Sequence, residues 1–173
     1  ISLCSKIGKA CYIPVGHKSP KCLKKDAVIK KLKKILEDPS IKKIGQNIKF
    51  DFIVFYKCGI TLSSMEDTML MSYVLDAGKN RHNMDTLSEI HLGHKTISFK
   101  EMVGTGKKEI NFSEVELDKA KDYAAEDADV TFRLYKKFIK NLKSEKMINI
   151  YEIFEKPLIK ILAFMEIEGV EID

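Results

Sequence analysis

Apolar residues recur at helical spacing along most of the chain. Between residues 26 and 36, Val28, Leu32 and Leu36 return every fourth position, and lysines occupy most of the opposite face. This pattern predicts an amphipathic helix over 26–36. The same reasoning predicts four further helical regions, at 47–58, 67–75, 84–92 and 149–168. Pro157 is expected to kink the last region or to start a new helix within it.

Short apolar runs predict strands over 1–3, 11–15 and 41–44, with Gly8 in the turn that joins the first two. Ser113 and Glu116 have the spacing of a capping box. It should open a long helical region that reaches about Leu142 and contains some break. Helices therefore dominate an α/β chain.

The composition is that of a globular protein. The chain has 173 residues, of which 45% are hydrophobic and 32% charged, so it can bury a core and is not disordered. No stretch approaches 18 consecutive apolar residues, and residues 1–30 lack a signal-peptide pattern. We therefore expect no membrane span, a cytoplasmic location and reduced thiols for the four cysteines. The chain begins without Met inside a strand-like pattern, which indicates a piece of a longer protein.

Lysines dominate the positive charge. The net charge is +5, and only Arg81 and Arg133 among the 30 basic residues are arginines. Such a surface could bind phosphates. A lysine-rich composition bias on solvated helix faces explains the same numbers, because charge of this size relates to solubility and not to fold. The loop of residues 104–107 (Gly-Thr-Gly-Lys) lacks P-loop spacing and is interpreted as a surface turn.

Two constellations could carry chemistry. In the first, Asn47 and Asp51 follow the strand at 41–44, four residues apart and therefore on one helix face. A carboxylate beyond the end of a strand is well placed to reach an active cleft. The structural explanation is that Asn47 caps the helix and Asp51 favours its positive N-terminus.

In the second constellation, Tyr123 and Asp127 share a helix face that also carries small alanines. An inward-facing Asp needs a partner, and a metal ion is one. Hydrolysis of phosphodiesters by two metal ions needs converging carboxylates, and a tyrosine hydroxyl could orient the water. The structural explanation is that Tyr123 packs and Asp127 pairs with a lysine.

Taken in order, the two constellations resemble the second and third motifs of the DEDDy proofreading nucleases. Further segments are similar to the 3′–5′ exonuclease domain of bacterial DNA polymerase I, at 81–87, 94–99, 104–107, 123–130 and 168–173. The resemblance implies an RNase H-like (DnaQ-like) fold with a mixed central sheet flanked by helices. It also implies an exonuclease-like domain over 1–150 and the start of the polymerase region over 151–173.

The resemblance also implies a mechanism. Four carboxylates in that family hold two divalent metal ions, Mg²⁺ or Mn²⁺, and water attacks the terminal phosphodiester to release a deoxynucleoside monophosphate. Asp51 and Asp127 would be metal ligands, and Tyr123 would orient the water.

Four residues match DNA-binding positions in that family. Asn47 and Phe99 would lie near the single-stranded 3′ end, where Phe99 could stack on a base. Arg81 and Met84 would belong to the DNA-binding region, where an arginine can hold phosphate. The implied partners are DNA and a polymerase domain in the same polypeptide.

The chain departs from the family at its start. No D-x-E motif is present, and the strands at 1–3 and 11–15 resemble the second and third strands of the family. The first strand and two of the four carboxylates are therefore missing, so we expect this chain to be weakly active or inactive. Three alternatives stay open: a non-catalytic domain that binds single-stranded DNA or braces the polymerase, an RNA-processing relative of the RNase D kind, and a helical interaction domain.

Overall fold

The computed structural model describes residues 1–106, 109–169 and 171. Lys107 of the expected surface turn and residues 170, 172 and 173 of the final segment lie outside the described part. In chain order the elements are β1 (Ser2–Lys6), β2 (Lys9–Tyr12), α1 (Lys25–Glu37), β3 (Lys43–Gly45), α2 (Ile48–Tyr56), β4 (Met65–Asp67), α3 (Thr68–Asp76), α4 (Met84–Leu92), α5 (Phe99–Val103), the 3₁₀ turn η2 (Phe112–Glu114), α6 (Leu117–Ser144), α7 (Ile148–Ile150), the π-helical turn η3 (Tyr151–Glu155) and α8 (Lys156–Glu168).

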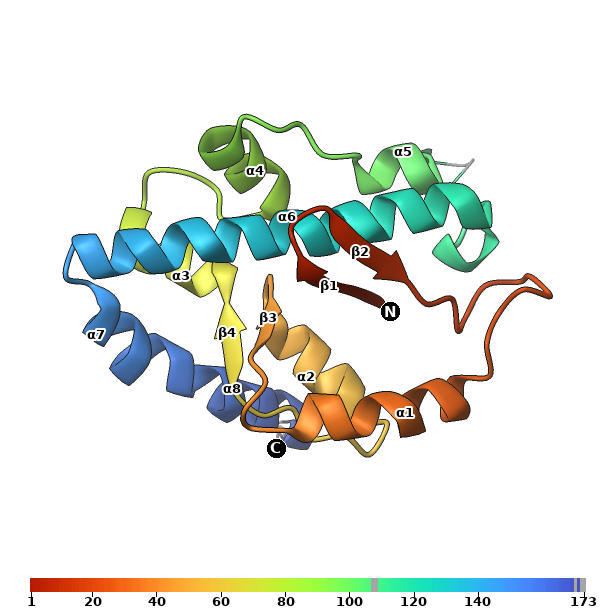
Figure 1. Cartoon of the computed structure of the whole chain (residues 1–173), viewed down its shortest axis with the longest axis horizontal. Coiled ribbons are helices and arrows are strands. Elements are labelled where there is room, and N and C mark those ends of the chain that lie inside the picture. The colour runs from red at the N-terminus through yellow and green to blue at the C-terminus, as the bar shows by residue number, and fades with distance from the viewer. Residues whose placement is uncertain (107–108, 170, 172–173) are drawn as a thin grey trace.

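Helix α6 organises the molecule (Figure 1). It runs across the whole view, with α4 and α5 on one side and the β1–β2 hairpin, α3 and the β3–β4 pair on the other. Helices α1, α2 and α8 lie furthest from α4 and α5. None of the helices in the described part is long and apolar enough to cross a membrane.

Three hydrophobic clusters hold these layers together, and the smallest packs α5 against the start of α6. The first joins α6 to α3, α4 and η3, and includes Leu87, Leu134, Phe138 and the fully buried Tyr151. The second joins α1, α2, β4 and α8. Each buried aliphatic or aromatic side chain contributes about 1.5–3 kcal/mol relative to an exposed one, so these clusters fix where α2 and α6 lie.

Helix α6 is continuous over 28 residues, so the expected break is wrong. Its buried residues form two groups, Ala120 with Ala124 and then Val130 to Leu142, so the helix packs on the core on both sides of residues 125–129, which are only partly buried. The capping box is also displaced: Asn111 and Glu114 form it, and it opens η2 and not α6.

Two short elements were not predicted, the strand β4 and the helix α5. Strand β4 has only three residues, all buried, and so shows no alternation in the sequence. Helix α5 starts at a capping box in which the Ser98 hydroxyl accepts from the Glu101 N–H and the Glu101 carboxylate accepts from the Ser98 N–H.

The strands form two separate pairs. β1 and β2 are antiparallel, with Leu3 opposite Cys11, and β3 and β4 are parallel, with Lys43 opposite Met65. Within the described residues, no ladder joins one pair to the other. In place of the expected single mixed sheet, the described residues thus form one antiparallel pair and one parallel pair.

The C-terminal helical region confirms a new helix start near Pro157. Pro157 lies in the first turn of α8, where its missing N–H leaves no intrahelical bond unmade. The π-helical turn η3 precedes it and carries Tyr151 into the core. Helix α8 in turn packs on α2, so this region supports the layer that holds Asp51.

Candidate active site

The first half of the site is built where β3 passes into α2. Gly45 ends the strand, and a Cβ there would lie 2.9 Å from the Ile48 side chain, so a larger residue would not fit. Asn47 then adopts a left-handed conformation with φ of 57°, and its side chain makes no capping bond. The structural explanation of Asn47 as a side-chain cap is therefore wrong.

The capping group comes from another element. The Asp67 carboxylate at the end of β4 accepts hydrogen bonds from the backbone N–H groups of Asn47 at 3.1 Å and Ile48 at 3.0 Å. Asp67 is only 1% exposed. Sequence reasoning did not identify this residue, because its contacts with α2 cross 19 and 20 positions of the chain.

Asp51 lies in the first turn of α2. Asp51 is exposed to solvent by its accessible surface, although many protein atoms lie around its carboxylate. This burial, with the nearby charge of Asp67, raises the pKa of Asp51 to about 6. Asp51 is therefore a carboxylate whose negative charge is not compensated by the described side chains around it.

The second half of the site lies on α6, where Tyr123 and Asp127 share one face. Oxygen Oδ1 of Asp127 is buried and has no hydrogen-bond partner among the described residues. Burial raises the pKa of Asp127 to about 7; the charges of Glu126 and Asp85 add to the rise, and hydrogen bonding from Tyr123 opposes it. Burial and the Asp127 charge also raise the pKa of the Tyr123 hydroxyl, so it stays protonated at neutral pH. The structural explanation that Asp127 pairs with a lysine is wrong for the described residues, because none of their ion pairs includes Asp127.

Phe99 reaches this face of α6 from α5. Its ring centroid lies 6.1 Å from that of Tyr123 and 5.9 Å from that of Phe112, and Phe112 lies 5.9 Å from Tyr123. The Phe99 side chain is still 49% exposed. The structure thus brings Phe99 and Tyr123 together and leaves an aromatic surface beside them.

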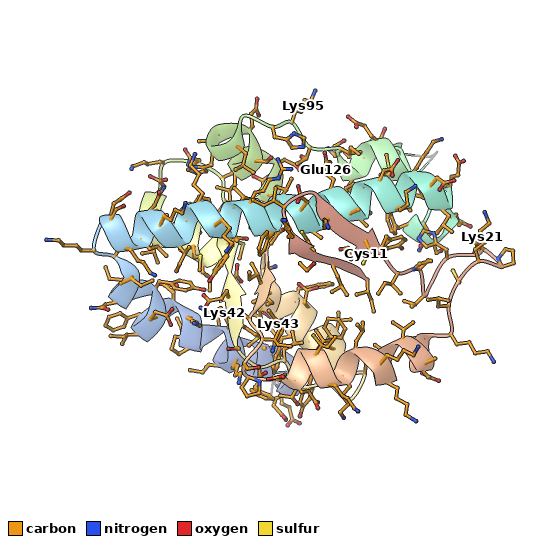
Figure 2. All side chains as sticks on the ribbon, viewed as in Figure 1. Cys11, Lys21, Lys42, Lys43, Lys95 and Glu126 are labelled. Carbon is orange, nitrogen blue, oxygen red and sulfur yellow. The ribbon has the colours of Figure 1, made fainter. Side chains whose placement is uncertain are left out.

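Glu126 holds the segment before α5 in place. Its two carboxylate oxygens bind His94 Nε2 at 2.8 Å and the backbone N–H of Ile97 at 2.7 Å. In Figure 2, Glu126 lies on the side of α6 that faces Lys95 and the loop after α4. Glu126 was not singled out from the sequence, although it directly precedes Asp127.

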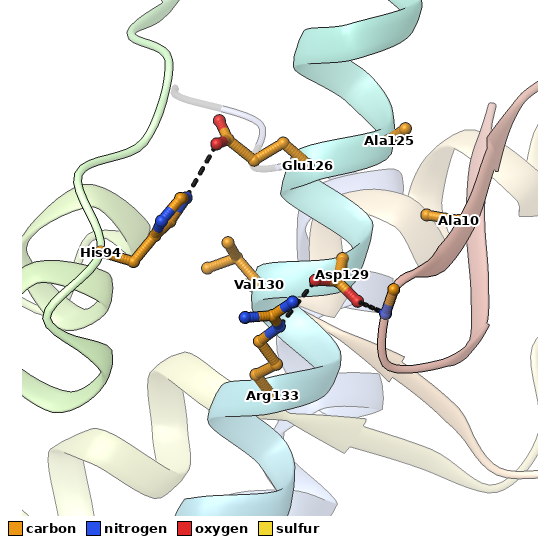
Figure 3. A pocket seen from close by; sticks show the side chains of 8 residues that line it. Ala10, His94, Ala125, Glu126, Asp129, Val130 and Arg133 are labelled. Atoms are coloured by element: carbon orange, nitrogen blue, oxygen red, sulfur yellow. Dashed lines mark hydrogen bonds and ion pairs between the residues drawn. The ribbon is translucent and has the colours of Figure 1, made fainter.

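The same glutamate lines an open pocket of about 320 Å³ between α6, the β1–β2 hairpin and the loop after α4 (Figure 3). On its other side, Asp129 accepts from the Gly8 N–H and pairs with Arg133. Asp51, Tyr123 and Asp127 do not line this pocket. The carboxylate side chains that line the pocket bind groups of neighbouring elements. We therefore interpret the pocket as a place where α6, the hairpin and the loop after α4 contact one another, and not as the candidate active site.

The remaining predicted DNA contacts have different surroundings. Arg81 is exposed on the loop before α4, and Gln46 Nε2 ties this loop to the β3–α2 turn by donating to the carbonyl of His82 at 2.7 Å. Met84 is partly buried against the first core cluster, where its sulfur accepts from the Thr131 hydroxyl at 3.5 Å. Arg81 thus has access to solvent, whereas Met84 is tied to the core.

A divalent metal ion fits these residues in part. Asp51 and Asp127 both have a raised pKa, and Asp127 Oδ1 is buried without a hydrogen-bond partner among the described residues. Carboxylates that bind a metal ion have these properties when no cation balances their charge. However, no three His, Cys, Asp or Glu side chains of the described residues converge on one point. The described residues thus show two carboxylates with a raised pKa, one on α2 and one on α6, and no group of three that converges on one point.

Comparison with known proteins identifies the family of this chain. A family model described as 3′–5′ exonuclease matches residues 1–143. A DNA polymerase I from Rhizobium leguminosarum is 41% identical over 95% of the chain, and one from Pseudomonas aeruginosa is 39% identical over all of it. The chain spans 17% and 20% of the length of these two relatives.

Solved structures show the same fold at low identity. A structure titled as the POL domain of Pol1 from M. smegmatis, in complex with DNA primer-template and dNTP, superposes with a TM-score of 0.69 at 19% identity, over 90% of this chain and 24% of that one. NrnC from Brucella melitensis, in a structure with bound Mg²⁺, superposes with a TM-score of 0.64 at 21% identity, over 91% of this chain and 70% of that one. The RNase H-like exonuclease fold is therefore confirmed.

Proposed function

The chain belongs to the 3′–5′ exonuclease family of DNA polymerase I, and from that premise we propose that it is the proofreading part of such a polymerase. In this proposal it removes nucleotides from a single-stranded DNA 3′ end and releases deoxynucleoside monophosphates. The observation that carries the proposal is the pair of uncompensated carboxylates, Asp51 and Asp127, with Tyr123 one turn from Asp127 on α6.

In this mechanism Asp51 and Asp127 would be ligands of the two divalent metal ions, Mg²⁺ or Mn²⁺. When bound, such ions neutralise phosphate charge and lower the pKa of water. Tyr123 remains protonated at neutral pH, so its hydroxyl can orient the attacking water by hydrogen bonding. Glu126 keeps the segment before Phe99 against α6 and thereby keeps the aromatic surface beside Tyr123.

The DNA 3′ end is held by groups around this centre. The exposed Phe99 ring stacks on a base, a contact that tolerates any base sequence. Arg81 holds a phosphate from the loop before α4. Asn47 binds near the terminal nucleotide, and Met84 supports the DNA-binding region from the core side.

The chain by itself supplies only two of the four expected carboxylates, so we propose that it has weak activity or none. The two separate strand pairs support this view. Ile1 and Ile13 exchange hydrogen bonds, so the backbone polar groups of Ser2 face the other edge of β1, where the described residues provide no ladder. A strand that carries the D-x-E motif would pair there and complete the site.

A second candidate function is a non-catalytic domain that binds single-stranded DNA or braces the polymerase. The observation that favours it is the lack of a three-ligand metal cluster among the described residues. It would use the same exposed Phe99 and Arg81 but would not need Asp127.

The test is release of mononucleotides from 3′-labelled single-stranded DNA, with Mg²⁺ or Mn²⁺, by this chain and by the longer polypeptide that contains it. We expect release by the longer polypeptide, abolished by Asp127→Ala and unaffected by Asp122→Ala, an exposed site on the same helix. Binding without release in both would support the non-catalytic domain. Preference for RNA ends over DNA ends would instead support an RNase D-like activity.

We also propose the polymerase domain as a partner in the same polypeptide, with residues 1–150 as the exonuclease-like domain and 151–173 as the start of the polymerase region. Exposed apolar side chains recur along η3 and α8 at three- and four-residue intervals: Phe154, Leu158, Ile161 and Met165. Such a surface is typical of an interface. Phe154→Asp in the longer polypeptide should speed proteolysis between the domains, and unchanged proteolysis would contradict this contact. A bacterial cytoplasmic location belongs to the same proposal, because the relatives are bacterial DNA polymerases and the proposed substrate is DNA.

A further inference from the structure

The buried carboxylate of Asp67 accepts hydrogen bonds from the starts of two helices, α2 and α3. Its Oδ2 atom accepts from the N–H of Ile48 at 3.0 Å. Its Oδ1 atom accepts from the N–H groups of Asn47 at 3.1 Å, Met69 at 2.8 Å and Leu70 at 3.4 Å. The carboxylate therefore satisfies backbone donors in the first turns of both α2 and α3, donors that a helix leaves without partners of its own.

The start of α2 depends on this remote carboxylate. Asn47 has a left-handed φ of 57°, which is uncommon for a residue other than glycine. An N-cap side chain normally accepts from the first turn of its own helix, but the Asn47 side chain does not. The Asn47 and Ile48 N–H groups are bound by Asp67 instead, so this turn is held from β4.

The backbone of Asp67 is itself anchored from the opposite direction. Its N–H donates to the Tyr151 hydroxyl at 2.9 Å, and that hydroxyl donates to Glu66 Oε2 at 3.0 Å. Glu66 is 1% exposed and pairs with Lys42 at 3.0 Å and with Lys156 at 2.9 Å. The position of Asp67 is thus set by buried contacts with η3 and α8 that do not involve α2.

We propose that Asp67 is a positioning residue of the exonuclease site, which fixes the start of α2 and thereby places Asn47 and Asp51. The inference rests on the proposed function, because it concerns the placement of that site. Asp51 is only three residues beyond Ile48, so any fraying of the first turn of α2 moves its carboxylate. A misplacement of about 1 Å in an active site can reduce the rate roughly 100-fold.

The experiment compares Asp67→Asn with Ser63→Ala in the longer polypeptide that contains this chain. The Asp67→Asn side chain would keep one acceptor oxygen but would direct an NH₂ group at an N–H of the α2 or α3 turn. Ser63→Ala is the matched control: it removes a hydroxyl that donates to the Glu37 carbonyl at 2.8 Å and accepts from Lys43 at 3.0 Å, away from α2. Both variants are studied below their melting temperatures, with circular dichroism to verify that they are folded.

Two readouts are made on each variant. The first is hydrogen–deuterium exchange of the peptide over residues 46–52 without metal. The second is kcat and KM for single-stranded DNA with Mn²⁺. We expect Asp67→Asn to speed exchange in this peptide roughly tenfold, as loss of one hydrogen bond allows, and to lower kcat up to about 100-fold, with a smaller change in KM. Ser63→Ala should change neither.

Unchanged exchange over 46–52 in Asp67→Asn would overturn the proposal. Faster exchange with unchanged kcat and KM would overturn it as well, because the turn would then be held without any effect on the site. A failure of the proposed function gives a different result: the unaltered protein would release no nucleotide, and the exchange measurement would still decide whether Asp67 holds the start of α2.

Discussion

Replacing Asp127 by asparagine should stabilise the protein when no metal is bound. Burial raises the pKa of Asp127 from 3.8 to about 7. The folded state therefore binds this proton more tightly than the unfolded chain, and ionisation of Asp127 between about pH 4 and pH 7 costs stability. Since each pKa unit corresponds to about 1.4 kcal/mol, the full penalty is about 4 kcal/mol, and the residual exposure of the side chain reduces it to about 2 kcal/mol.

The assay is thermal unfolding in EDTA from pH 4 to pH 8. We expect Asp127→Asn to raise the melting temperature by roughly 4–8 °C at pH 8, since about 1 kcal/mol corresponds to about 2–4 °C for a domain of this size. The gain should shrink as the pH falls and become small near pH 4, where Asp127 is protonated in the folded state and close to its midpoint of titration in the unfolded chain. Added Mn²⁺ should stabilise the unaltered protein but not the variant.

The control is Asp122→Asn, five positions earlier on α6, where the side chain is 66% exposed. It should leave the melting temperature unchanged at every pH. Our reasoning would be refuted if Asp127→Asn were no more stable than the unaltered protein at pH 8, or if its gain were the same at pH 4 and pH 8. Either result would mean that Asp127 is not an uncompensated buried carboxylate.

Three further predictions concern single side chains. Tyr123→Phe should lower the rate of nucleotide release by about 10²-fold with little change in DNA affinity, measured by fluorescence anisotropy; equal loss of both would speak against a role in orienting water. Phe99→Ala should weaken binding of single-stranded DNA by about 1–3 kcal/mol, and unchanged affinity would argue against stacking. Tyr151→Phe should lower the free energy of unfolding, measured by urea titration, by about 1–3 kcal/mol. The reason is that the Asp67 N–H loses its acceptor and Glu66 loses a donor. An unchanged midpoint of unfolding would show that water replaces the hydroxyl.

Local patterns in the sequence were sufficient to locate most helices and part of the site. The periodic apolar residues of α1, α3 and α4 predict these helices closely, because each buries one stripe against the core. Tyr123 and Asp127 could be paired for the same reason, since four residues on a helix share a face. The order of the motifs also predicted the exonuclease family, which the comparisons confirm.

The remaining features depend on contacts between distant segments. β4 is three buried residues and shows no pattern of its own, and it is a strand only because β3 lies beside it. The expected break in α6 is absent because buried residues on both sides of 125–129 pack on the core. The sequence by itself determined which helices form and which carboxylates they carry. Only the tertiary structure decided how Asp51 and Asp127 are held, because burial, the Asp67 cap at the start of α2 and the Glu126 contact with Ile97 all arise when chain segments 19 or more residues apart pack together.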